Sequence, residues 1–332
     1  MVVPSRTSPS AGGSPTSVVG ALWTLPRQLF VLAGQSNMAG RDQVFAVAAP
    51  DALPLLQSRP VVSFAQRAEK WQRARHPLHA DKPEKAGVGP GLACAHHLLE
   101  EHDATTAGGV GLVPCAFGGS ELSRWEAGGD LFEECVRRVK LAQSDASEPT
   151  RLAGILWHQG ENDCGEAASA ATYAERLPRA LDALRAALGA PDLPIVVGEL
   201  GYWLDQADPD YVHAAAINAA IVSAPRALAH CACVSSHGLR HKGDRLHFDA
   251  ASSEELGRRY ATAWLSIDTD AQDVSPVPSK RPRLQDVAPP QAGAPDCEAP
   301  SDSAAPFSFP TSASEASEVC GGLQATEAAI RD

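Results

Sequence analysis

A short apolar run that stops at a glycine, with a serine two positions later, places the strongest constraint on what this chain folds into. Residues 29–33, Leu-Phe-Val-Leu-Ala, have the length and composition of a buried strand, and Gly34 follows directly. Glycine permits a tight exit, so Ser36 stands just past the strand end, where a helix is expected. Ligands bind at this edge of open parallel α/β sheets. Ser36 is therefore a candidate nucleophile, provided that a base and an oxyanion site lie elsewhere in the chain.

A candidate base lies far downstream, in the segment DRLH that runs from Asp244 to His247. Asp249 follows it and is typical of a helix N-cap, so the segment is expected on the loop that leads into the last helix. A carboxylate this close can hold the imidazole in one tautomer while the other ring nitrogen faces the serine. The order serine, then aspartate and histidine, predicts a triad of Ser36, Asp244 and His247.

Strand and helix patterns alternate along residues 27–267, which we predict to be a single domain. Strand patterns begin near positions 29, 110, 152, 195 and 229, and a weaker one covers 61–64. Helical patterns cover 91–102, 130–142, 168–188, 211–223 and 250–265. This alternation is typical of βαβ crossovers. It predicts an α/β fold with three layers, α/β/α, around a mainly parallel sheet of about five strands in flavodoxin-like order.

Two more predicted strands end in unusual residues. The strand that begins near 110 runs into Gly118 and Gly119, where backbone N–H groups can approach a ligand closely. The strand that begins near 152 runs into the polar segment HQGEND, which contains Gln159 and Asn162. Both amides suit an oxyanion because they carry no charge that must be desolvated. Since the carboxyl ends of parallel strands share one edge, these groups are expected to lie near Ser36.

Composition limits the partners and the location of the protein. The chain has 332 residues, 44% hydrophobic and 20% charged, enough for one domain of roughly 200–250 residues with tails. A net charge of −12 argues against nucleic acid and anionic membranes as partners, and no apolar run reaches the roughly 20 residues that span a bilayer. Small residues and proline dominate 1–26 and 268–332, which predicts a disordered N-terminal extension and a disordered low-complexity tail.

We expect an intracellular, cytoplasmic location. Residues 1–17 lack the apolar core of a secretory signal, and the eight cysteines are interpreted as free thiols in a reducing compartment. An organelle transit peptide is an alternative, because no acidic residue precedes Asp42. Residues 280–283, KRPR, resemble a short nuclear import signal, of a kind that also occurs often by chance.

Four blocks along positions 34–247 together resemble the SGNH hydrolase superfamily. They are GQSNMAGR from Gly34, CAFGGSELSRW from Cys115, WHQGEND from Trp157 and DRLH from Asp244. Within the superfamily, the likeness is to carbohydrate esterases of the sialate O-acetylesterase type, including their plant members. The resemblance implies the flavodoxin-like SGNH hydrolase fold and a serine esterase that removes O-acetyl groups from carbohydrates through an acetyl-serine intermediate. It implies no metal and no cofactor.

The resemblance also implies roles for individual residues. It puts the nucleophile at Ser36, the base at His247 and its orienting partner at Asp244. Oxyanion donors would be the Ser36 backbone N–H, an N–H of Gly118 or Gly119, and one amide side chain of the third block.

That amide is left open between two residues. Gln159 belongs to the QGE of the carbohydrate-esterase branch, whereas Asn162 belongs to the Gly-X-Asn-Asp of the wider superfamily, and this sequence carries both. Our preference at this point is Gln159, because the branch that lacks the asparagine would need it.

Five further residues are candidates for supporting or substrate-binding roles, namely Gln35, Asn37, Arg41, Trp125 and Glu161. Arg41 would bind a substrate oxygen or pair with a carboxylate. Trp125 would stack on a sugar or pack beneath its loop. Glu161 would orient the catalytic loop or make a structural hydrogen bond.

The expected partner is an acetylated sugar or another small ester. Two alternatives are another SGNH hydrolase for a different small ester or lipid, and a sugar-binding protein that has lost turnover. The presence of Ser36, Asp244 and His247 together argues against the loss of turnover. The sequence names neither the sugar nor the oligomeric state.

Overall fold

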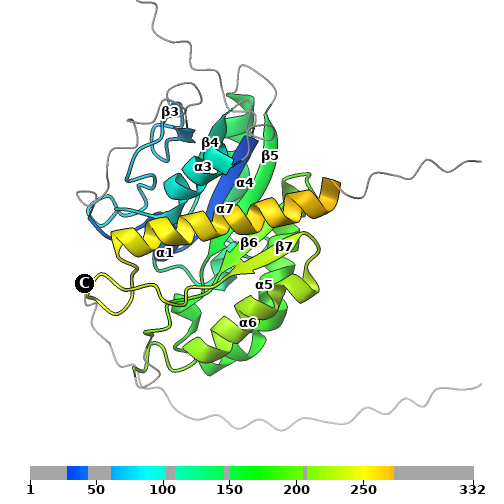
Figure 1. Cartoon of the computed structure of the whole chain (residues 1–332). Helices are drawn as coiled ribbons and strands as arrows, with labels where there is room; N and C mark the ends of the chain where they lie inside the picture. The colour runs from blue at the N-terminus through cyan, green and yellow to red at the C-terminus, as the bar shows by residue number, and fades with distance from the viewer. Residues whose placement is uncertain (1–27, 44–60, 102–108, 146–149, 205–207, 273–332) are drawn as a thin grey trace, which may run out of the picture. The chain divides into compact units, whose positions relative to one another are not determined.

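The computed structural model describes residues 28–43, 61–101, 109–145, 150–204 and 208–272 (Figure 1). The predicted N-terminal extension, the import-signal candidate at 280–283 and nearly all of the predicted tail lie outside the described residues. Within the described ranges, no helix is both long and apolar enough to cross a membrane.

A central sheet has the strand order β3-β2-β4-β1-β5-β6-β7. Its strands are β1 (Gln28–Gly34), β2 (Val61–Phe64), β3 (Trp71–Arg73), β4 (Val110–Pro114), β5 (Arg151–His158), β6 (Ile195–Gly198) and β7 (Cys231–Val234). Neighbouring strands are parallel except for the antiparallel pair of β2 and β3. The strands predicted most clearly, β1, β4, β5, β6 and β7, lie in the flavodoxin-like order, which confirms the predicted fold class.

The sheet has seven strands, where about five were predicted. β2 is fully buried but only four residues long, and it follows an irregular stretch of sequence, so its pattern was weak. β3 is a three-residue strand at the sheet edge, too short for any alternation of apolar and polar residues to be visible. Both strands extend the sheet beyond β4.

Helices cover both faces of the sheet, which gives the predicted three layers (Figure 1). They are α3 (Pro90–Glu101) and α7 (Ala250–Gln272) on one face, and α4 (Asp130–Ser144), α5 (Ala167–Ala187) and α6 (Ala214–Ala227) on the other. Alternate side chains of β1 pack into two hydrophobic cores, one on each face of the sheet. Val31 and Ala33 pack with α4, α5 and α6, whereas Phe30 and Leu32 pack with α3 and α7.

Helix ends depart most from the sequence pattern in α6 and α7, and α6 ends at Ala227, four residues later than predicted. α6 begins three residues later than predicted, because Tyr211 and its neighbours form a turn whose His213 N–H donates to Cys164 O (2.9 Å). α7 begins where predicted, and Asp249 caps it by accepting the Ser252 N–H at 2.7 Å. It continues past the predicted end at 265, and Trp264 near that point is anchored to the sheet through Ala153 O (2.7 Å).

The strand order determines where a ligand can bind. β1 lies between β4 and β5 in the sheet. From β1 the chain first forms the strands on the β4 side, and only after β4 does it cross to β5 on the other side. The segments that follow these three strands therefore meet at one crevice at the carboxyl edge of the sheet. β1 and β5 approach closely there, since a Cβ on Gly34, whose φ is +121°, would lie 2.1 Å from His158 O. Glycine at position 34 is thus required by both backbone angle and space.

Candidate active site

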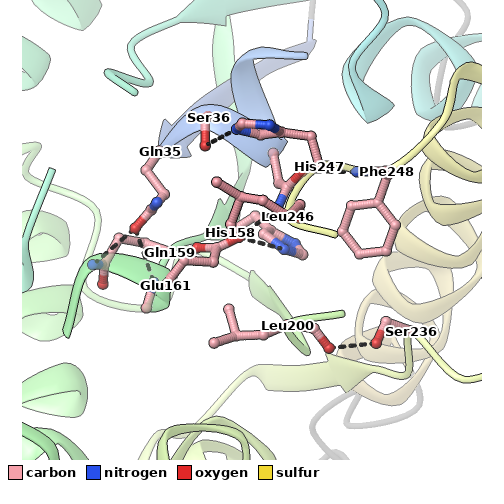
Figure 2. Close-up of polar contacts among 12 residues, drawn as sticks. Gln35, Ser36, His158, Gln159, Glu161, Leu200, Ser236, Leu246, His247 and Phe248 are labelled. Atoms are coloured by element: carbon pink, nitrogen blue, oxygen red, sulfur yellow. Dashed lines mark hydrogen bonds and ion pairs between the residues drawn. The ribbon is translucent and has the colours of Figure 1, made fainter. Parts of the chain in front are cut away.

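Ser36 opens a helix of only four residues, α1 (Ser36–Ala39), directly after β1. The preceding Gln35 N–H donates to His158 O at 2.8 Å, which fixes the exit of the chain from the sheet. The Ser36 hydroxyl lies 3.0 Å from Nε2 of His247 (Figure 2). Ser36 is 5% exposed, so the hydroxyl is accessible only through the cleft described below.

His247 is held by Asp244 within a tight loop before α7. Oδ2 of Asp244 lies 2.7 Å from Nδ1 of the ring, and Oδ1 accepts the backbone N–H groups of Leu246 (3.0 Å) and His247 (2.8 Å). Arg245 between them has a φ of +60°, which turns the loop sharply enough for these contacts. The hydrogen-bond network assigns the ring proton to Nδ1 and leaves Nε2 to accept the proton of Ser36.

The protonation states match these contacts. Burial disfavours the imidazolium and lowers the pKa of His247 below its ordinary value, although Asp244 opposes part of this shift. Partial burial disfavours ionisation of Asp244, but the N–H groups of His247 and Leu246 and the imidazole outweigh it, so the pKa of the carboxyl lies well below its usual range. At neutral pH the ring is therefore uncharged and the carboxylate is ionised, as a base and its partner require.

Asn37 connects the Ser36 segment with the His247 loop. Its Oδ1 accepts the Phe248 N–H at 3.1 Å, and its Nδ2 lies 3.4 Å from Leu246 O and 2.5 Å from Oε1 of Glu161. The residues on both sides of His247 are thus bonded to the residue that follows Ser36. This arrangement fixes the distance between the hydroxyl and the imidazole.

The two predicted glycines differ in their hydrogen bonds. The Gly118 N–H donates to Oδ2 of Asp81 at 2.8 Å, whereas no partner is recorded for the Gly119 N–H within the described part of the chain. The same Oδ2 accepts from the Arg41 guanidinium at 2.5 Å. Burial disfavours ionisation of Asp81, but Arg41 and the Gly118 N–H outweigh it, and the pKa of the carboxyl lies below its ordinary value. Of the two glycines, Gly119 has the N–H free for a ligand.

The two candidate amides lie in different surroundings. Gln159 is fully buried, and its Nε2 donates to Ser120 O (3.0 Å) and Oδ2 of Asp163 (2.6 Å) while its Oε1 accepts from Tyr173. Both of its amide hydrogens are therefore engaged within the protein. Asn162 instead lines the cleft, and its Oδ1 lies 4.0 Å from the position that a Cβ on Gly119 would occupy. The geometry thus departs from our preference for Gln159 and favours Asn162 as the amide that faces a ligand.

A cleft of about 210 Å³ opens over the Ser36 hydroxyl. Its walls come from several segments, and they are Gln35, Ser36, Arg41, Lys82, Lys85, Gly118, Gly119, Glu161, Asn162, Tyr211, Leu246 and His247. Sequence reasoning missed Asp81, Lys82, Lys85 and Tyr211. They lie in irregular segments without periodicity, and no local pattern indicates that Lys82, Lys85 and Tyr211 line the cleft or that Asp81 pairs with Arg41.

The weaker candidates fall into distinct roles. Gln35 accepts long hydrogen bonds at its Oε1 from Gln159 Nε2 and Gly160 N (both 3.3 Å), and so ties α1 to the segment after β5. Arg41 pairs with a carboxylate, one of its two expected roles, and also lines the cleft. Trp125 is not a sugar-stacking wall, because it is 2% exposed and packs edge-on against Trp157.

Glu161 makes the structural hydrogen bond considered for it, to Asn37, from the short helix η4 (Glu161–Asp163). Trp125 belongs to another short helix, η3 (Leu122–Trp125). Among the described residues, no group of three or more His, Cys, Asp or Glu side chains is arranged to hold a metal ion.

The chain is similar to a family of known proteins. A family model described as carbohydrate esterase, sialic acid-specific acetylesterase, matches residues 26–266. A protein of Arabidopsis thaliana named "Probable carbohydrate esterase At4g34215" is 32% identical over 257 residues, 73% of this chain and 91% of that protein. A solved structure of the Arabidopsis protein has a TM-score of 0.62 and 30% identity, covering 73% of this chain and 99% of that chain. The crystal structure of a carbohydrate acetylesterase from Xanthomonas citri has a TM-score of 0.51 and 17% identity over 73% of this chain and 57% of its own, a likeness of fold alone.

Proposed function

Because the chain belongs to the family of carbohydrate esterases described as sialic acid-specific acetylesterases, we propose that it removes O-acetyl groups from carbohydrates with Ser36 as the nucleophile. One observation carries this proposal. Oγ of Ser36, the ring of His247 and the carboxylate of Asp244 form a continuous line of contacts of 3.0 Å and 2.7 Å. A serine hydroxyl is weakly nucleophilic unless a base accepts its proton, and this line supplies both the base and the group that orients it.

In the first half of the reaction, Nε2 of His247 takes the Ser36 proton while Oγ forms a bond to the acetyl carbonyl carbon. The negative charge that develops on the carbonyl oxygen is stabilised by the backbone N–H groups of Ser36 and Gly119 and by the amide of Asn162. The tetrahedral intermediate then collapses. The bond to the sugar oxygen breaks, His247 gives its proton to that oxygen, and acetyl-Ser36 remains.

In the second half, water attacks acetyl-Ser36 and gives a proton to His247. The same donors stabilise the oxyanion, and the bond between the acetyl carbon and Oγ breaks as the proton returns to Ser36. The products are acetate and the unmodified enzyme. The ionised Asp244 stabilises the imidazolium that forms in each half without taking the proton itself.

The charge of the cleft supports an acidic sugar as the acetylated substrate. Within a chain of net charge −12, the cleft has three basic side chains, Arg41, Lys82 and Lys85, and a single buried carboxyl, Glu161. Arg41 is neutralised by Asp81, but the structure records no ion pair for either lysine in the described segments. Two uncompensated ammonium groups beside the nucleophile favour a sugar that carries a carboxylate, as a sialic acid does.

Ser36→Ala tests the nucleophile directly. We expect the variant to lose hydrolysis of 4-nitrophenyl acetate and of acetylated sialic acid, and to lose labelling by a serine-directed fluorophosphonate, with an unchanged melting temperature. Ser123→Ala is the matched control, since Ser123 is exposed on η3 and lies outside the cleft. A peptide map should locate the label on Ser36. Turnover or labelling that survives Ser36→Ala would remove Ser36 from the mechanism, and a folded parent chain without either would favour a binding protein.

A further inference from the structure

A buried histidine beneath the catalytic loops has an assignable tautomer. Nδ1 of His158 lies 3.2 Å from the hydroxyl oxygen of Tyr260, and that hydroxyl donates its only hydrogen to Trp157 O at 2.7 Å. The Tyr260 oxygen must therefore accept from His158, which puts the ring hydrogen on Nδ1. His158 is fully buried, and burial lowers its pKa to about 3. Its Nε2 consequently presents a lone pair and has no hydrogen-bond partner.

The group that faces this lone pair is a carboxyl. Oε1 of Glu161 lies 3.7 Å from Nε2 of His158, and Oε2 of Glu161 is buried without a hydrogen-bond partner (Figure 2). An ionised carboxylate would place one acceptor opposite another, in a region where Glu161 is 2% exposed. A carboxylic acid protonated at Oε1 has a hydrogen to direct toward His158, and a lone pair of the same oxygen can still accept from Asn37.

We propose that Glu161 is a neutral carboxylic acid in the active protein, with its proton directed toward His158, and that it is a positioning residue for the catalytic loops. The role in catalysis rests on the proposed esterase function, whereas the protonation state stands on the hydrogen-bond geometry. Glu161 acts through two neighbours. Asn37, bonded to its Oε1, holds the loop of His247, and Asn162 follows it on η4.

No positive charge compensates an ionised Glu161. The guanidinium of Arg41, in the same cleft, is paired with Asp81, and neither Lys82 nor Lys85 makes an ion pair with Glu161 in the described structure. On η4 itself, the buried Asp163 adds a like charge. Among the described charged neighbours, Arg41 is thus committed to Asp81, Asp163 is repulsive, and the two lysines form no ion pair with the carboxyl.

The remaining titratable groups around Glu161 are neutral near pH 7. Tyr173 on α5, Tyr260 on α7 and Tyr211 before α6 have raised pKa values because of burial, as does the thiol of Cys164. His247 on its loop is neutral because burial lowers its pKa. Burial likewise raises the pKa of Glu161 to about 7, in agreement with the geometric assignment.

Ionisation of Glu161 has a structural consequence. A buried charge without a partner is stabilised only by water or by movement toward solvent. Either change displaces η4, which carries Asn162, and weakens the contact with Asn37. We therefore expect the protein to lose activity as pH rises through 7, for a reason separate from the loss of activity at low pH that follows protonation of His247.

Glu161→Gln is the decisive variant, since glutamine reproduces the shape and the neutral charge of the acid but has no proton to lose. The measurement is kcat/KM for 4-nitrophenyl acetate from pH 5 to pH 9 in both proteins. We expect the ratio of parent to variant to fall about tenfold between pH 6 and pH 8, because the neutral fraction of a group with a pKa of about 7 falls by that factor. A ratio that does not change with pH would overturn the proposal.

Asp163→Asn is the companion variant, because Asp163 is a second buried carboxyl of η4 that does not contact Asn37 and that raises the pKa of Glu161 as a like charge. Relative to the parent, it should move the midpoint of the alkaline loss to lower pH, whatever its effect on stability. A merely structural glutamate would lose activity equally at all pH values when replaced by glutamine.

Infrared spectroscopy tests the proton without any turnover, and so separates this proposal from the proposed function. The parent chain at pH 6 should show the carbonyl band of a buried carboxylic acid, which Glu161→Gln removes and which titrates away above pH 7. Nitrogen NMR of the parent should find His158 protonated at Nδ1 alone. Absence of the acid band at pH 6 would show that Glu161 is ionised, and a proton on Nε2 of His158 would overturn the tautomer on which the proposal depends.

Discussion

Nε2 of His247 lies 3.0 Å from Oγ of Ser36, although 211 positions separate them in the chain. One residue opens α1 after the central strand, and the other lies on the loop before the last helix. The contact depends on Asn37, which bonds to the residues on both sides of His247. The relative position of nucleophile and base is thus set by backbone contacts as well as by the triad itself.

The acid side of the pH profile should report His247. Burial lowers its pKa below the ordinary 6.5, so the neutral base persists below that pH, and kcat/KM should fall only when the ring gains a proton at still lower pH. In Asp244→Asn the interaction that raises the pKa of His247 is lost. The midpoint of the acid limb should therefore move further down, while kcat itself falls. An acid limb at or above pH 6.5 in the parent, or one that Asp244→Asn leaves in place, would contradict this assignment.

Replacement of Asn162 should lower kcat, whereas replacement of Gln159 should lower the stability of the fold. Removal of one oxyanion donor costs about 10²–10³ in kcat, so Asn162→Ala should lose that factor with little change in melting temperature. Gln159→Ala removes a buried amide that bonds to Ser120, Asp163 and Tyr173, and should lower the free energy of unfolding by about 1–3 kcal/mol. Steady-state kinetics and thermal denaturation of both variants check this. A large loss of kcat in Gln159→Ala, with little loss in Asn162→Ala, would instead assign the side-chain oxyanion donor to Gln159.

Asp81 should matter for stability and for catalysis, although it touches neither Ser36 nor His247. Its side chain is fully buried and pairs with Arg41 while it accepts the Gly118 N–H. Asp81→Ala leaves a buried guanidinium unpaired, which typically destabilises by about 3–5 kcal/mol, and frees the turn that carries Gly119. Asp81→Asn keeps an acceptor for the Gly118 N–H.

We expect kcat to be lower in Asp81→Ala than in Asp81→Asn. The double variant Arg41→Met with Asp81→Leu should be more stable than Asp81→Ala alone, since it leaves no unpaired charge. Denaturant unfolding of the set measures the coupling. Equal stability of Asp81→Ala and the parent would show that the pair does not stabilise the turn.

Lys82 and Lys85 should affect binding of acidic substrates only. The double variant Lys82→Gln with Lys85→Gln should raise KM about fivefold to tenfold for an acetylated sugar with a carboxylate, and leave KM for a neutral acetylated sugar unchanged. Added salt should reduce the difference by screening. Lys140→Gln is the control, because Lys140 is exposed on α4 and does not line the cleft. An equal rise in KM for both sugars would exclude recognition of charge.

Some segments of the fold and the site could be predicted from the sequence, and others could not. Three segments of the site have a local signal in the sequence. A strand pattern that ends in glycine marks the exit from β1 at Gly34, and a cluster of polar residues marks the segment after β5. A helix cap marks the aspartate–histidine segment before α7. The edge strand β3 has no such signal, because three residues cannot display a period. Asp81 and Tyr211 also have none, since their roles depend on contacts with distant segments.

The sequence by itself predicted the alternation of strands and helices, the flavodoxin-like sheet order and the three residues proposed as the triad, because apolar periodicity and residue chemistry can be read locally. Only the tertiary structure decided which amide faces the cleft, which glycine N–H is free and which charges remain uncompensated. These depend on the partner that each polar group finds when segments distant in the chain pack together, and burial decides whether a group without a partner keeps its charge.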